Sequence, residues 1–488
     1  MRRALGPQYD QVLMFPPVVE DWVGPEHPAR FIREIVEQTD LGALGFAMRE
    51  SAEGGEYFPA RCLLAVWLYG YFRKIRSVRE LERSCANDLG FIWLIGLRTP
   101  DHNTLWNFYH QHRQAIGRLF KESVKMALRL DLVGLVLQAI DGTKIQALCA
   151  GRISQSQEAH AQALAELDRS LAETETAIAL AEAVGAVPAP HLPQALQNQE
   201  RLRAKVAAAV QEMEQSGRRH CHAQEPEARR VETEGSNRFG YNAQVVVDSA
   251  NQVIVAAEVF AQETDHGLLV PMAEAARENL EATVLSVADC GYAGRESFAA
   301  AEAAQVPVFT ALPERWQPAE GERFHTSQFV YDPQRNCLIC PAGQSLPQVR
   351  TRQKNGESHA VYRNKGACAQ CPLRSQCTSD RSGRTIDLGP HDEALQRQRL
   401  RQAAPAVKEV LRQRSRIVEP VFAQIKTQGR FRRWTVRGLE NVRAQWAWLC
   451  TSWNLRVLYR HWRGQFSEQP SAWAHALSGV QGGRACAS

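Results

Sequence analysis

Two aspartates in distant parts of the sequence each follow an apolar run. Asp141 follows residues 133–140 and precedes Gly142, and Asp289 follows residues 283–288. Because short apolar runs predict buried strands, we expect each aspartate where a strand ends. Carboxylates so placed can supply the oxygen ligands that hard divalent cations need in phosphodiester chemistry. An Asp-Gly pair is also a common turn, so a purely structural explanation stays open for Asp141.

A third carboxylate, Glu419, lies in the most basic segment of the chain. From Ala394 to Arg463 there are sixteen Lys and Arg residues against three acids, a net charge of +13. The whole chain carries +5, so the remainder sums to about −8 and the positive charge is concentrated here. A polyanion is the expected partner of such a segment.

Helical geometry divides this basic segment into two faces. At 100° per residue, four residues fall within an arc of roughly 80°: Arg412, Arg416, Glu419 and Lys426. An adjacent arc is apolar and consists of Leu411, Val418, Phe422 and Ile425. A solvated helix with ion pairs at i,i+3 and i,i+4 would show the same pattern, and Pro420 could kink the helix or start a new one.

Five of the twelve cysteines cluster between residues 337 and 377. Cys337 and Cys340 form one Cys-x-x-Cys-Pro knuckle, and Cys368 and Cys371 form a second. Four thiolates at this spacing fit a structural zinc ion, which would stabilise a segment with little core of its own. Cys377 makes the fourth ligand ambiguous, and reduced, unliganded thiols are the alternative.

The elements that must position these groups fall into two kinds. Residues up to about 130 look mainly helical, with a buried helix over 60–73 and a further helix for which Asn103 or Thr104 is a plausible cap. Short helices with tight turns suit a helix-turn-helix-like DNA-binding unit, although helical packing explains the pattern equally well.

From residue 133 onward the sequence predicts a mixed sheet with helices on it. A hairpin is expected over 241–248 and 252–259, and an edge strand over 306–312. Residues 152 to about 215 predict a helical hairpin, inserted for recognition or dimerisation. The other acids, such as Asp248 and Asp265, are expected to be surface or turn residues.

The composition indicates a globular protein. With 488 residues, 44% apolar and 23% charged, the chain can form two or three cores. It contains no run of eighteen apolar residues, and its first residues lack the apolar stretch of a secretory signal. We therefore expect a soluble, intracellular protein with no membrane contact.

Several short motifs together resemble one enzyme family. They are Ile-Asp-Gly-Thr-Lys at 140–144, Ala-Asp-Cys-Gly-Tyr at 288–292, Val-Glu-Pro-Val-Phe-Ala-Gln-Ile-Lys at 418–426, Pro-Asp-His-Asn-Thr at 100–104, Arg-Gly-Leu at 437–439 and Asn-Leu at 454–455. In this order they resemble the DDE transposases of bacterial insertion sequences, over about Tyr9 to Leu458. Each motif is weak alone, and their order carries the resemblance.

The resemblance implies an α/β fold with a ribonuclease-H-like core, and two Mg²⁺ or Mn²⁺ ions held by Asp141, Asp289 and Glu419. Lys426 falls at the family's basic position. Related enzymes have an arginine four residues before the glutamate, where this chain has Ser415, and their tyrosine has no counterpart here. The nearest arginine is Arg416, so its phosphate contact is a weaker prediction than that of Lys426.

The resemblance and the charge together predict partners and domains. DNA is expected as substrate, both transposon-end inverted repeats and target DNA, with Arg416, Lys426, Arg432 and Arg433 as contacts. A homodimer in the DNA complex, working in the bacterial cytoplasm at the nucleoid, is implied. The expected domains are a helical N-terminal domain (1–130), the first part of the core (131–312) with the helical insertion at about 150–235, a zinc-ribbon-like cysteine insertion (313–390), the last part of the core (391–465) and a tail (466–488).

Two other functions remain compatible with these residues. A DNA-binding protein of the same descent could have lost its activity, although the presence of all three acids argues against it. A metal-dependent nuclease without strand transfer would use the same site, because hydrolysis and joining differ only in which hydroxyl attacks.

Overall fold

The computed structural model describes residues 18–48, 57–149, 156–183, 191–233, 235–313, 316, 323–354, 356–465 and 470–478. Residues 1–17, where a secretory signal was sought, and most of the 466–488 tail lie outside them. The chain forms two compact units, one from Met1–Leu119 with Thr451–Ser488 and one from Phe120–Cys450. No helix in the described ranges combines the length and the apolar character needed to cross a bilayer.

The first unit is helical and its core is rich in aromatic rings. Its elements are the 3₁₀ turn η1 (Val19–Trp22), α1 (Pro28–Gln38), α2 (Ala60–Phe72), α3 (Val78–Asn87), α4 (Leu89–Ile95), α5 (His102–Gln111), the start of α6 (Arg113–Arg129), the end of α15 (Leu439–Gln465) and α16 (Pro470–Ser478). The ring of Phe31 packs 5.5 Å from Tyr459, 5.6 Å from Trp462 and 6.0 Å from Trp473. The buried helix predicted over 60–73 is confirmed by α2, of which Leu63–Tyr71 are all buried.

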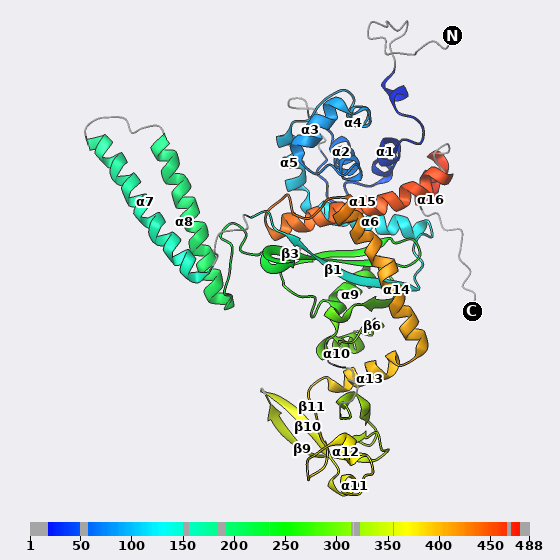
Figure 1. Ribbon diagram of the computed structural model, residues 1–488. Helices are drawn as coiled ribbons and strands as arrows, with labels where there is room; N and C mark the ends of the chain where they lie inside the picture. Colours follow the sequence, from blue (N-terminus) through cyan, green and yellow to red (C-terminus); the bar gives the residue numbers. More distant parts are fainter. Residues whose placement is uncertain are drawn as a thin grey trace, which may run out of the picture. The chain divides into compact units, whose positions relative to one another are not determined.

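The second unit is built on a six-stranded mixed sheet (Figure 1). Its strands are β1 (Leu137–Gln146), β2 (Arg229–Thr233), β3 (Ser236–Asp248), β4 (Ile254–Phe260), β5 (Leu285–Ala288) and β6 (Val308–Thr310). The order is β2-β3-β1-β5-β6, with β4 also paired to β3. Strands β1, β5 and β6 run parallel, whereas β3 is antiparallel to β1, β2 and β4. The predicted mixed α/β sheet, its β3–β4 hairpin and its edge strand β6 are thus confirmed.

Strand β1 does not end at Asp141, so that prediction was wrong. The antiparallel ladder to β3 continues from Gln138↔Asp248 through Asp141↔Val245 to Gln146↔Gly240. Gly142 does not form a turn. It leaves room for the Gln244 side chain, because a Cβ at this position would lie 2.0 Å from the Gln244 Nε2 atom. The same prediction is confirmed for Asp289, which directly follows the last residue of β5.

Helices α9 (Leu269–Leu280), α10 (Arg295–Ala303), α13 (Asp392–Gln402) and α14 (Pro405–Phe422) follow in the same unit. Helix α9 packs on β3 and β4, and α14 packs on β1, β3 and β5. The helical insertion is confirmed as two helices packed together, α7 (Gln157–Ala183) and α8 (His191–Ser216) (Figure 1).

The cysteine insertion has a sheet and a core of its own. Strands β7 (Val330–Asp332), β8 (Cys337–Ile339), β9 (Ser345–Lys354), β10 (Glu357–Arg363) and β11 (Thr385–Leu388) form the sheet, joined by the short helices α11 (Lys365–Ala369) and α12 (Arg374–Cys377). Phe329, Leu338, Tyr362 and Ile386 are each at most 2% exposed and pack together. The expectation of little core was therefore wrong, because alternate strand residues supply one.

Helix α14 runs through Pro420 without ending there. Proline has no N–H for the carbonyl of Arg416, four residues earlier, and the side chain of Gln252 donates a hydrogen bond to that oxygen instead, at 3.0 Å. A π-helical segment, Ala423–Gln428, follows directly. Because a π-helix turns by less than 100° per residue, the arc predicted to contain Lys426 with Glu419 does not hold.

Candidate active site

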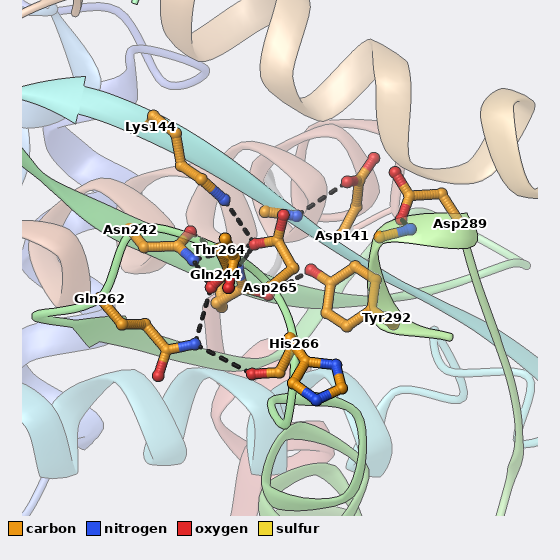
Figure 2. A network of polar contacts seen from close by, with 12 residues as sticks. Asp141, Lys144, Asn242, Gln244, Gln262, Thr264, Asp265, His266, Asp289 and Tyr292 are labelled. Carbon is orange, nitrogen blue, oxygen red and sulfur yellow. Dashed lines mark hydrogen bonds and ion pairs between the residues drawn. The ribbon is translucent and has the colours of Figure 1, made fainter. Parts of the chain in front are cut away.

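Asp141 and Asp289 lie next to each other at one place in the central sheet. Strands β1 and β5 pair in parallel as far as Ala139↔Val287, and each aspartate follows two residues later. Figure 2 shows their carboxyl groups side by side. The Asp289 Oδ1 atom accepts a hydrogen bond of 2.8 Å from the backbone N–H of Gly291, which fixes its direction. The sheet therefore gathers two carboxylates that are 148 residues apart in the sequence.

Asp141 is largely buried and carries a cationic partner. Burial raises the pKa of Asp141 to about 6, as does the nearby Asp289, whereas Arg414 and the Gly142 N–H act to lower it. The Arg414 Nη1 atom donates to Asp141 Oδ2 at 2.8 Å, and the Gly142 N–H donates to Oδ1 at 2.8 Å. The side chains of Arg414 and Asp141 are 21% and 18% exposed. A guanidinium of α14 thus supplies positive charge to a carboxylate that desolvation would otherwise protonate.

A polar network supports β1 from the other face. Asp265 accepts three hydrogen bonds on its Oδ1 atom, from Lys144 Nζ at 2.6 Å, Asn242 Nδ2 at 2.9 Å and Gln244 Nε2 at 2.7 Å (Figure 2). Lys144 lies three residues after Asp141, and side chains alternate along a strand, so the two point to opposite faces. The network therefore fixes the strand that carries Asp141.

Tyr292 extends this network toward Asp289. Its side chain is fully buried, and its hydroxyl donates to Gln244 Oε1. Burial first, then the acids Asp265, Asp141 and Asp289, raise the pKa of Tyr292 well above its usual value, so the phenol stays protonated. The backbone after β5 is in this way tied to β3.

The structure corrects the expectations for the two other acids. Asp265 is not a simple surface residue, because it is the acceptor at the centre of this network. Asp248 is 1% exposed and accepts hydrogen bonds from the N–H groups of Gly134, Ala250 and Asn251. It is the last residue of β3, and its carboxylate caps the turn that follows, so its assignment to the surface was wrong.

Glu419 lies on an exposed part of α14, whereas its neighbours Ile417, Val418 and Val421 are buried. Within the described ranges, no three His, Cys, Asp or Glu side chains form a group that could hold a metal ion. The structure therefore brings Asp141 and Asp289 together, and it leaves Glu419 outside a three-carboxylate group.

A basic cleft of 540 Å³ begins at Gly142, the residue after Asp141; we call it the β1 cleft. Its charged lining residues are Lys144, Glu232, Arg238, Lys426, Arg432 and Arg433. Lys426, Arg432 and Arg433, all expected to contact DNA, are thus brought together, whereas Arg416 does not line the cleft. Part of the Arg433 guanidinium is already used, since it donates to the carbonyls of Ala147 and Leu148.

Sequence reasoning missed Arg414, Lys144, Arg238 and Asp265. Lys144 belongs to the Ile-Asp-Gly-Thr-Lys motif, so its place beside Asp141 was a usable signal. The other three reach the site through packing between distant segments, and no local pattern marks them.

In the cysteine insertion, four thiols line one small pocket of 20 Å³: Cys340, Cys368, Cys371 and Cys377. Cys337 is 2% exposed, lies in β8 and does not line this pocket. Burial raises the pKa of Cys377, and the three nearby thiols act in the same direction, whereas Arg384 lowers it. The geometry favours Cys377 over Cys337 as the fourth member of the group.

Comparisons with protein families match two parts of the chain. Residues 339–459 match a transposase DDE domain, and residues 17–111 match a transposase domain (DUF772). The first range contains Glu419 and the cysteine pocket, and the second lies in the helical first unit. No curated protein matches the chain.

Proposed function

We propose that this chain, which belongs to the DDE transposases of bacterial insertion sequences, binds the terminal inverted repeats of its element and catalyses metal-dependent DNA cleavage and strand transfer. The observation that carries the proposal is that Asp141, on β1, lies next to Asp289, directly after the parallel strand β5, and that a basic cleft begins at Gly142, the residue after Asp141. A carboxylate pair next to a surface that attracts polyanions suits metal-dependent chemistry on DNA.

The sheet supports a ribonuclease-H-like core. Three parallel strands, β1, β5 and β6, continue into the antiparallel strands β3 and β4. This mixed order places the first aspartate on the central strand and the second directly after its parallel neighbour. The helical insertion between β1 and β2 leaves this arrangement intact.

Asp141, Asp289 and Glu419 would hold two Mg²⁺ or Mn²⁺ ions, as oxygen ligands suited to hard cations. The fit is supported by Asp141 itself, because a positive group, the Arg414 guanidinium, already contacts its Oδ2 atom at 2.8 Å. Bound metal would activate the attacking hydroxyl and stabilise the leaving oxygen. Glu419 would be the ligand supplied by a helix rather than by the sheet.

The chain's own residues then have separate tasks. Arg414 neutralises Asp141 in the absence of another cation. Asp265, Gln244 and Tyr292 hold β1 and the backbone after β5 in place, so the two aspartates keep their spacing. These three are positioning residues, because they act through the strands.

DNA would lie in the β1 cleft, held mainly through its phosphates. Lys426 and Arg432 line it together with Lys144 and Arg238. Arginine and lysine neutralise phosphates and release counterions, which gives affinity without sequence preference. Arg416, on α14, does not line this cleft, so any phosphate that it contacts would lie outside the cleft.

We propose a structural zinc ion for the cysteine insertion, held by Cys340, Cys368, Cys371 and Cys377. As they stand, these thiols do not form a metal-holding group, so zinc would draw together the four that line one small pocket, since thiolates are preferred ligands of structural zinc. Zinc content after purification should be close to one per chain and should be lost in Cys377→Ser but kept in Cys337→Ser. Chelation should lower the unfolding temperature of the parent protein, whereas a metal-free parent with unchanged stability would contradict the proposal.

The expected partners are transposon-end and target DNA, with a homodimer in the DNA complex. A transposase has two ends to join, which favours two copies acting together. Its substrate places it in the bacterial cytoplasm, at the nucleoid when bound.

The proposal is tested with purified protein, Mg²⁺ and a DNA fragment that carries the flanking inverted repeats. Nicked ends followed by joined products are the expected result. Nicking without joined products would indicate a nuclease, and binding without nicking would indicate an inactive DNA-binding protein.

A further inference from the structure

A second basic cleft lies outside the site described above. It has a volume of 440 Å³ and lies where the helical insertion returns to the sheet, between the end of α8 and β2. Four arginines line it, Arg218, Arg219, Arg229 and Arg230, with a single acid, Glu263. We call it the arginine cleft.

The four arginines fall into two pairs with different roles. Arg218 donates to Ser216 Oγ and the Pro226 carbonyl, and Arg229 also donates to the Pro226 carbonyl, at 3.1 Å. These two shape the cleft by holding the loop between α8 and β2.

Arg219 and Arg230 are exposed and have no hydrogen-bond or ion-pair partner among the described residues. Both lie close to His220, whose pKa is lowered by burial and by these two guanidinium groups. Neither guanidinium group forms an ion pair with a described residue, although Glu263 lines the cleft and, with Glu158, acts on the pKa of His220 in the opposite direction. Two exposed arginines without an ion-pair partner in a cleft lined by four arginines and one acid are suited to an anion.

The β2–β3 hairpin separates this cleft from the β1 cleft. Asn237 lines the arginine cleft, whereas the next residue, Arg238, lines the β1 cleft. Adjacent residues of a strand point to opposite faces, so one hairpin provides a wall for both. If DNA extends from the β1 cleft across this hairpin, its next phosphates would lie near Arg219 and Arg230.

We propose that the arginine cleft binds the phosphate backbone of the transposon-end DNA, beyond the part held in the β1 cleft. The inference rests on the proposed function, since that function supplies the DNA. Guanidinium groups fit phosphate oxygens in a bidentate manner, and duplex DNA offers one charge per about 1.7 Å of its axis. The helical insertion would in this way carry a binding site at its base.

The test compares two double variants of the full chain. Arg219→Gln/Arg230→Gln removes the two free arginines, and Arg169→Gln/Arg201→Gln removes the same charge from exposed positions on α7 and α8. Dissociation constants are measured against salt, with a short duplex that ends within the β1 cleft and with a longer one. The cleft variant should bind the long duplex about tenfold more weakly at 0.1 M salt, with a salt slope smaller by about two.

The short duplex and the control variant distinguish a loss of contacts in the arginine cleft from a general loss of positive charge. With the short duplex, the cleft variant should match the parent, and cleavage at saturating DNA should be unchanged. Equal losses in both double variants, or none in the cleft variant while the parent binds and cuts, would overturn the inference alone. A change in self-association with unaltered DNA binding would overturn it as well, in favour of contact with a second copy. A parent that neither binds nor cuts repeat DNA would instead refute the proposed function.

Discussion

Asp141 and Asp289 are fixed by the sheet, whereas Glu419 lies on an exposed part of a helix. Asp141 is paired within the β1–β3 ladder and contacts Arg414, and Asp289 is fixed by the Gly291 N–H. Glu419 is followed by Pro420 and then by a π-helical segment. Two ligands of the proposed metals are therefore positioned by the sheet, whereas the position of the third depends on how α14 packs on the sheet.

The largest loss of cleavage is expected when a carboxylate is neutralised, either on the sheet or on helix α14. Asp141→Asn and Glu419→Gln should each lower cleavage at least about 1000-fold, because residues of one metal centre act as a unit. A double variant should be no worse than either single one.

Stability should separate the two changes. Burial raises the pKa of Asp141 to about 6 despite its contact with Arg414, so the ionised carboxylate disfavours folding at pH 7, and Asp141→Asn should raise the free energy of unfolding by about 1–3 kcal/mol. Glu419→Gln, on an exposed position, should change it by about 0.5 kcal/mol or less. Urea unfolding and a nicking assay measure both effects. A Glu419→Gln protein with parental cleavage would remove the helix residue from the site and leave only the sheet pair.

A smaller effect on cleavage is expected from Asp265, the acceptor at the centre of the polar network on β1. Asp265→Asn removes the charge that faces Lys144 and should slow cleavage about 10- to 100-fold at saturating DNA, as positioning groups near metal ligands do. Binding of DNA should change little. Glu274→Gln, an exposed acid on α9, is the matched control and should behave like the parent. Parental cleavage by Asp265→Asn would show that the network serves stability only.

The smallest effects concern DNA affinity. Lys426→Ala and Arg432→Ala should each lower the slope of binding against salt by about one, with a loss of several fold in affinity. Arg416→Ala removes the same charge outside the β1 cleft and is the comparison. An equal change for Arg416 would place the DNA along α14 rather than in the cleft.

The sequence predicted the sheet half of this comparison better than the helix half. Apolar runs identified β5, the β3–β4 hairpin and the edge strand, since burial dictates their composition. The apolar run at residues 283–288 correctly predicted that Asp289 follows the end of a strand. Asp141 was misplaced at a strand end because Asp-Gly usually marks a turn, whereas here Gly142 lets Gln244 approach.

Long-range packing explains most of what the sequence did not reveal. Arg414 reaches Asp141 only because α14 packs on β1, and Asp265 reaches Lys144 from a loop 121 residues away. The arc through Glu419 and Lys426 assumed a regular α-helix, whereas a π-helical segment begins at Ala423 and contains Lys426. No pattern of residue types along the chain reports such contacts.

If Asp289 and its partners hold the metals for DNA cleavage, the Asp289→Asn protein should bind DNA without cutting it. Asp289→Asn protein is incubated with Mg²⁺ and DNA that carries the inverted repeats, and nicked and joined products are quantified beside DNA binding. The account predicts unchanged or tighter binding, because a negative charge is removed beside a positive surface, and a loss of both products. Nicking and joining at the parental rate would contradict the account and leave the aspartates with structural roles only.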